Sequence, residues 1–123
     1  MNERFNKKEL QDRFKRFTIA VFKMLENLPK SPACNVITYQ LLKASSSGAA
    51  NYRAACRAKS KRDFVNKLKT VEEETDESLF WLELIDEMKF ANEKEISFLL
   101  EECNELVAII TTSLKTLRNQ EGG

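Results

Sequence analysis

The side chains with the clearest chemical potential are lysines and arginines that could bind phosphate. Arg53 and Arg57 are four residues apart, so on a helix they lie on one face. Asp63 is the only acidic residue between positions 27 and 71, so few carboxylates compete there with an anion. Guanidinium and ammonium groups in such an arrangement bind phosphate through charge-assisted hydrogen bonds. The predicted nucleic-acid-binding residues are Arg13, Lys15, Arg16, Lys23, Arg53, Arg57, Lys59, Lys61 and Arg62.

Two other interpretations of these basic residues remain open. The acidic third helix could neutralise them, or they could form a solvated face without a ligand. Residues 1–70 carry 16 Lys and Arg against 5 Asp and Glu, whereas residues 71–123 carry 4 against 14, and the net charge is +1. This division favours a polyanion ligand or a contact between oppositely charged surfaces. Nothing in the sequence indicates recognition of particular bases.

Catalytic groups are poorly represented in the chain. It has no histidine, which excludes Ser-His and Cys-His nucleophile pairs and histidine-based zinc sites. The acidic run over 72–77 could be considered as a nuclease metal site, with Glu73 and Glu77 on one helix face. Hard-metal sites usually draw carboxylates from several elements, however, and no lysine or histidine base accompanies this run. We interpret it as a solvated or salt-bridging face, and we expect no catalytic residues, no metal, no cofactor and no enzymatic activity.

The tyrosines and cysteines have structural interpretations. Tyr39 and Tyr52 could stack on nucleic-acid bases, but their helical spacing is more typical of packing residues. Cys34, Cys56 and Cys103 are far apart and lack a Cys-x-x-Cys spacing, which predicts buried apolar residues in a reducing compartment. No apolar signal core begins the chain, and no apolar run approaches the ~20 residues that a membrane span needs. We therefore expect a soluble, cytoplasmic protein with no membrane partner.

Four helices must position these residues, and each has a start signal. The predicted helix starts are Asn6 with Glu9, Ser31 with Pro32, Ser60 with Asp63, and Asn92 with Glu95. Pro29 must end the first helix. The middle of the second helix, residues 44–50, is rich in serine and could instead be a flexible linker. We predict a continuous helix there, because small residues allow a neighbouring helix to approach closely.

Apolar residues recur along each helix at spacings of three and four, as a buried helix face requires. The predicted buried faces are Leu10, Phe14, Phe17, Val21, Leu25 and Leu28; Ile37, Leu41, Ala44, Ser47, Gly48, Asn51, Ala55 and Ala58; Phe64, Leu68, Val71, Thr75, Leu79, Leu82 and Ile85; and Ile96, Leu100, Cys103, Val107, Ile110, Leu114 and Leu117. Short connections predict antiparallel neighbours. The predicted fold class is all-α, an up-down-up-down antiparallel four-helix bundle forming one domain over 1–123, with disordered tails at 1–5 and 119–123.

The chain has more apolar surface than one four-helix core can bury. Residues 79–85 are apolar on nearly every side of their helix, and Leu99, Leu106 and Ile109 lie off the main face of the fourth helix. A helix that is apolar all round is buried all round, which in a chain of 123 residues indicates another subunit. The predicted oligomer interface is Ile19, Phe22, Phe80, Trp81 and Leu84. The alternative is a wide core face with scattered apolar residues on the surface.

Charge indicates how such subunits would meet. The first two helices are basic and the last two acidic, so we expect each pair to form one side of the molecule. A two-fold dimer that paired identical sides would place like charges together. A head-to-tail ring instead pairs the acidic side of one subunit with the basic side of the next, and it closes only for a fixed rotation.

Three stretches resemble the small bacterial four-helix-bundle family encoded in intervening sequences of 23S ribosomal RNA genes, the S23 ribosomal protein-like family. They are Gly48-Ala49-Ala50-Asn51-Tyr52-Arg53 continuing to Arg57-Ala58 and Ser60; Phe64-Val65 with Glu74-Thr75-Asp76-Glu77-Ser78 and Phe80-Trp81-Leu82; and Glu102, Cys103, Leu106 and Ser113-Leu114. The resemblance covers nearly the whole chain. Ala54 stands where the family often carries Glu, and Ala49-Ala50 replaces the usual Val-Ala. The first difference makes this surface more basic.

The resemblance implies a homo-oligomer, a pentameric ring with a tapered, basic surface. A related branch of the family accompanies the reverse transcriptases of diversity-generating retroelements and resembles a nucleic-acid-binding accessory. The partners it implies are therefore further copies of the chain, RNA or DNA, and a protein such as a reverse transcriptase.

Two functional hypotheses follow. The first is a non-enzymatic oligomeric bundle that binds RNA or DNA through a basic surface on the first two helices. The alternative is a structural or adaptor module that binds a protein partner through the same surface and no nucleic acid. An RNA-cleaving enzyme is disfavoured, because the chain offers no assembled acid–base pair.

Overall fold

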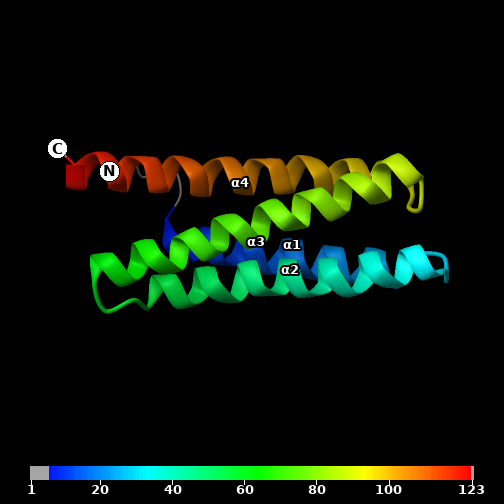
Figure 1. Cartoon of the computed structure of the whole chain (residues 1–123), viewed down its shortest axis with the longest axis horizontal. Coiled ribbons are helices and arrows are strands. Elements are labelled where there is room, and N and C mark those ends of the chain that lie inside the picture. The colour runs from blue at the N-terminus through cyan, green and yellow to red at the C-terminus, as the bar shows by residue number, and fades with distance from the viewer. Residues whose placement is uncertain (1–5, 123) are drawn as a thin grey trace.

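The computed structural model describes residues 6–122, which form four antiparallel helices (Figure 1). They are α1 (Lys7–Leu25), α2 (Pro32–Cys56), α3 (Lys61–Met88) and α4 (Glu93–Gly122). Each helix packs against the next one along the chain, and α4 closes the bundle against α1. The start of α1, the α2–α3 connection and the end of α4 therefore lie at one end of the bundle, and the other two connections lie at the opposite end. The predicted up-down-up-down fold is confirmed.

Each helix starts at the predicted residue. The cap side chains accept a hydrogen bond from the backbone N–H three residues later: Glu9 to Asn6 at 2.8 Å, Cys34 to Ser31 at 3.1 Å, Asp63 to Ser60 at 3.0 Å and Glu95 to Asn92 at 3.1 Å. Such bonds satisfy backbone donors that a first helical turn leaves unpaired. The four helix starts are thus determined locally.

The middle of α2 is helical throughout, as predicted. Gly48 is buried where α2 meets α3, and a Cβ atom added to it would lie 3.2 Å from Thr75 Oγ1. The hydroxyls of Ser45 and Ser46 donate to the carbonyl oxygens of Leu41 and Leu42, at 2.8 and 2.7 Å. The small residues therefore permit close approach of α3. The serine hydroxyls find their hydrogen-bond acceptors on the backbone of α2 itself.

The buried faces of α1 and α2 largely follow the predicted spacing, whereas those of α3 and α4 shift in part. On α3, Val65 and Ser78 are buried where Phe64 and Leu79 were expected. On α4, the fully buried residues are Ile96, Leu99, Cys103, Leu106, Ile110 and Leu114, while Leu100, Val107 and Leu117 are half-buried. The prediction that Leu99 and Leu106 lie off the core is wrong. Adjacent positions on these helices are both apolar, so periodicity alone could not choose between them.

The last predicted feature concerns the tails. Residues 119–122, expected to be disordered, continue α4, because no strong helix breaker precedes Gly122. The expected tail at 1–5 and residue 123 lie outside the described residues. Over the described chain, no helix is both long enough and apolar enough to cross a membrane.

Candidate nucleic-acid interface

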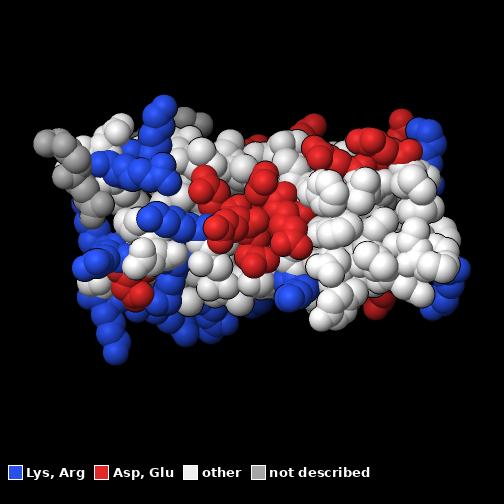
Figure 2. Space-filling model, viewed as in Figure 1, with Lys and Arg blue, Asp and Glu red and all other residues white. Residues whose placement is uncertain are grey.

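The antiparallel order of the helices gathers basic side chains at one end of the bundle. The segments that meet there, 7–16, 53–71 and 112–122, carry fourteen Lys and Arg and four Asp and Glu. The remaining described segments, 17–52 and 72–111, carry five and fourteen. Figure 2 shows the face formed by α2, α3 and α4, with blue at this end and red at the middle. Charge therefore divides along the long axis as well as between the helix pairs: α1 and α2 are basic and α3 and α4 acidic overall, as expected, but the first half of α3 is basic.

The α2–α3 connection carries the densest group of predicted phosphate-binding residues. Arg53, Arg57, Lys59, Lys61 and Arg62 are all exposed. Among residues 6–122, no carboxylate oxygen lies within 4.0 Å of the side-chain nitrogens of Arg53, Arg57, Lys61 or Arg62. We call these five residues, together with Lys115 and Arg118 of α4, the basic end.

Arg13 is not part of the basic end, because it forms ion pairs with α4. Its guanidinium donates to Glu102 of α4 from Nε at 3.1 Å and from Nη2 at 2.7 Å, and Nη2 lies 2.9 Å from Glu105 Oε1. Its side chain is 17% exposed. The hydrogen bond to Glu102 raises the pKa of Arg13 above its ordinary value, despite the opposing effect of burial. Arg13 therefore ties α1 to α4 and does not present its guanidinium to a ligand.

The other three predicted residues of α1 lie at different heights along the bundle. Lys15 and Arg16 are exposed near the middle of the helix. Lys23 lies in the last turn, at the end opposite Arg57. At 1.5 Å per residue it is about 24 Å along the axis from Lys7. The structure thus brings together the predicted residues of α2 and α3 and leaves Lys23 apart from them.

Neither tyrosine offers a ring at the basic end. Tyr52 is 4% exposed and stacks on Phe14 with ring centroids 5.3 Å apart. Burial raises the pKa of its hydroxyl. Tyr39 is exposed on the first half of α2, at the opposite end of the molecule. The packing interpretation is therefore correct for Tyr52, and Tyr39 is a surface residue.

The acidic run lies on the middle of α3, where Figure 2 shows its carboxylates as a compact red area. Glu77 accepts a hydrogen bond from Trp81 Nε1 at 3.1 Å, and Glu72 accepts one from the Thr111 hydroxyl at 2.9 Å. Partial burial, followed by the charge of Glu77, raises the pKa of Glu74. Within residues 6–122, no three Cys, Asp or Glu side chains converge on a point that could hold a metal ion.

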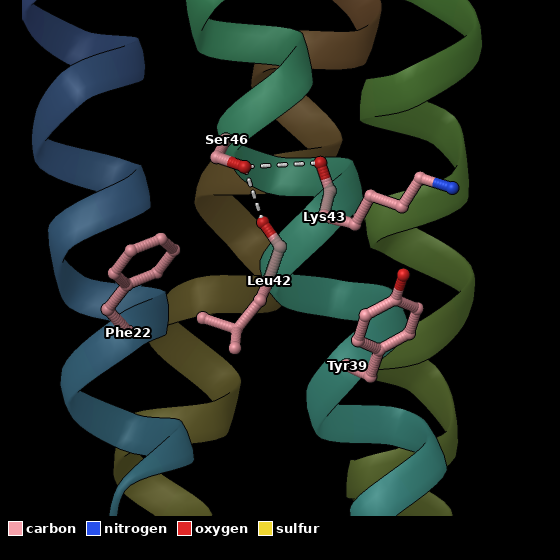
Figure 3. A pocket seen from close by; sticks show the side chains of 5 residues that line it. All are labelled: Phe22, Tyr39, Leu42, Lys43 and Ser46. Atoms are coloured by element: carbon pink, nitrogen blue, oxygen red, sulfur yellow. Dashed lines mark hydrogen bonds between the residues drawn. The ribbon is translucent and has the colours of Figure 1, made fainter.

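The predicted interface residues are exposed to different degrees. Phe80 is 50% exposed, Ile19 47% and Phe22 40%, whereas Trp81 and Leu84 are half-buried against the core. Sequence reasoning missed four further exposed apolar residues: Val36, Tyr39, Met88 and Phe98. Their positions off the buried faces could have revealed them. Phe22 and Tyr39 border a shallow depression of about 300 Å³ with Leu42, Lys43 and Ser46 (Figure 3).

Comparison with known proteins now identifies the family. Residues 7–112 match the pattern that defines the 23S rRNA-intervening sequence proteins. The chain belongs to this family. No curated protein matches the sequence. A solved structure from Bacteroides thetaiotaomicron, a protein of unknown function from the S23 ribosomal protein family, is 27% identical and superposes with a TM-score of 0.76, covering 86% of this chain and 98% of its own.

Family membership gives a physical meaning to one of the stretches that suggested it. In this 23S rRNA-intervening sequence protein, the stretch from Gly48 to Arg53 contains a buried glycine against α3, the buried Tyr52 and the exposed Arg53. The stretch therefore combines a packing requirement with one surface cation. The matched range spans α1 to α3 and most of α4, so it includes the basic residues of the α2–α3 connection.

Proposed function

We propose that this protein is a non-enzymatic, oligomeric bundle that binds the phosphate backbone of RNA or DNA at its basic end. The observation that supports this proposal is the group of exposed cations on the α2–α3 connection, four of which have no carboxylate within 4.0 Å among the described residues. A solvated cation without an internal partner retains its full interaction with an incoming phosphate.

The acidic residues of the same chain strengthen this assignment. Glu72, Glu73, Glu74, Asp76 and Glu77 lie farther along α3, in the middle of the bundle, so they leave the cations at its end unneutralised. Cations of this kind contact phosphates and carry no base preference. We expect binding that depends weakly on sequence and steeply on salt.

We propose further that copies of the chain assemble head to tail into a ring, with five copies the number implied by the family resemblance. The outer face of α1 carries Lys15, Ile19, Phe22 and Lys23, and the outer face of α3 carries Glu73, Glu77, Phe80 and Leu84. Each face is apolar and exposed in part, and their charges are opposite. Contact between two different faces is heterologous and forms a ring when the rotation closes.

Fluorescence anisotropy with labelled RNA and DNA tests the binding proposal. We predict that the double variant Arg53→Glu, Arg57→Glu weakens binding by at least about tenfold at about 50 mM salt, since two phosphate contacts become repulsive. The matched control Lys30→Glu, Lys94→Glu changes the net charge equally but lies at the opposite end of the bundle, so its affinity should stay close to that of the wild type.

The outcomes separate the two functional hypotheses. Equal affinity of the two double variants, with helical content intact by circular dichroism, would refute the basic end as the site. Absence of salt-dependent binding in the wild type would instead favour the adaptor hypothesis, in which the partner is a protein such as a reverse transcriptase.

A further inference from the structure

The basic end extends beyond the sequence cluster to the last turns of α4. Lys115 and Arg118 are exposed, and they belong to the half of the chain that is acidic overall. The up-down order brings them to the same end as Arg57 and Lys61. Because α4 packs against α3, these cations lie one helix away from Lys61 and Arg62.

This arrangement is a two-dimensional array of charge. Neighbouring helices pack with their axes 8–10 Å apart in general, so cations on α2, α3 and α4 form rows with roughly that spacing. The two phosphate rows that border a groove of a double helix are separated by a similar distance, about 6 Å for the minor groove and about 12 Å for the major groove of B-DNA. A single strand presents one row and can engage only part of such an array.

Among residues 6–122, Tyr52 and Phe64 are the aromatic residues nearest the α2–α3 connection, and both rings already have contacts within the fold. Tyr52 is buried against Phe14, and the Lys7 ammonium lies 4.8 Å from the centroid of the half-buried Phe64 ring. Proteins that bind single strands combine a basic groove with exposed rings on which bases stack. Here the exposed cations offer contacts to phosphates, which a double helix displays on its outside.

We propose that the ligand is double-helical nucleic acid, and that it crosses the basic end from the α2–α3 connection to the last turns of α4. This inference rests on the proposed function and specifies its ligand class. The acidic residues 72–77 on the flank of the bundle repel phosphates, so the duplex lies across the end and not along the helices.

The test compares four probes of equal length with the wild-type protein. They are duplexes of about 16 base pairs of RNA and of DNA, and an unstructured single strand of each. We expect at least one duplex to bind about tenfold more tightly than both single strands at the same salt concentration. Binding of both duplexes indicates that the site recognises phosphate rows in general. Binding of the RNA duplex alone indicates that the site recognises the A-form geometry of that duplex.

A pair of variants tests the position of the duplex. Lys115→Glu with Arg118→Glu should weaken duplex binding by about tenfold, as Arg53→Glu with Arg57→Glu does, while Lys30→Glu with Lys94→Glu leaves it unchanged. Circular dichroism confirms that each variant remains folded.

Three results would overturn parts of this inference. Single strands that bind as tightly as duplexes would reject the duplex and leave the proposed function intact. Unchanged duplex affinity in the α4 variant, with the expected loss in the α2 variant, would reject the contribution of α4. Failure of all four probes to bind would reject the proposed function as well.

Discussion

At the scale of single residues, Arg13 and Arg53 illustrate two uses of the same side chain. Arg53 is exposed on α2 without a carboxylate nearby among the described residues. Arg13, also surrounded by other basic residues in the sequence, reaches Glu102 and Glu105 on α4. Proximity of basic residues in the chain therefore does not decide which of them can meet a ligand. The partner on the neighbouring helix decides it.

Arg13→Ala should lower the free energy of unfolding by about 1–3 kcal/mol, because Glu102 loses two charge-assisted hydrogen bonds and Glu105 loses an ion pair that join α4 to α1. Urea unfolding followed by circular dichroism measures this loss. The matched control is Arg16→Ala on the same helix, an exposed residue whose removal should change the free energy by less than about 0.5 kcal/mol. Equal losses in the two variants, or a tenfold loss of nucleic-acid affinity in folded Arg13→Ala, would contradict the structural role.

At the scale of elements, the helices begin and end by local rules. Serine and asparagine caps start all four, and Pro32 occupies the first position of α2. The end of α3 is less regular, because Lys89 adopts the left-handed conformation at φ 58° and ψ 43°. Its N–H donates to the carbonyl oxygen of Asp86, and that of Phe90 donates to Ile85. This geometry, common at helix ends, usually carries glycine.

Lys89→Gly should therefore raise the free energy of unfolding by about 1 kcal/mol, since glycine adopts this conformation without the steric penalty of a Cβ atom. Thermal or urea unfolding measures the gain. Lys89→Ala is the matched control: it removes the same charge but keeps the Cβ atom, so it should bring no comparable gain. A stabilisation equal in both variants would show that charge, and not backbone conformation, governs this position.

At the scale of the whole molecule, three kinds of surface follow one another along the bundle. The face in Figure 2 passes from the basic end through the acidic middle to a region over the first half of α2 and the second half of α3 whose centre is white and whose edges carry red and blue side chains. The exposed apolar residues of those two segments are Val36, Tyr39, Phe80 and Met88. The proposed self-association and the proposed nucleic-acid binding would therefore use different residues.

The double variant Trp81→Ala, Leu84→Glu should convert the proposed oligomer into a folded or partly folded monomer, because buried aromatic residues carry most of the energy of an interface and a buried carboxylate opposes association. Light scattering coupled to size-exclusion chromatography measures the mass. The matched control, Thr112→Ala with Thr116→Glu, introduces the same charge on exposed positions of α4 and should keep the wild-type mass. A wild-type mass of 14.2 kDa at micromolar concentration would refute the ring.

The sequence alone determined the number of helices, their starts and the continuity of α2. Caps such as Asn6 and Ser60 act within three residues of themselves, so local sequence suffices to place them. The alternation of apolar residues likewise determined that α4 has a buried side. The sequence also showed that a cluster of cations lies near the α2–α3 connection.

Only the tertiary structure decided which residues of neighbouring helices contact one another. The choice of Leu99 over Leu100 for the core of α4, and the pairing of Arg13 with Glu102, depend on which helix lies alongside and at what height. The same antiparallel register brings Lys115 and Arg118 to the basic end, although about sixty residues of chain separate them from Arg57. Register between helices is set by packing over the whole bundle, and no local pattern contains it.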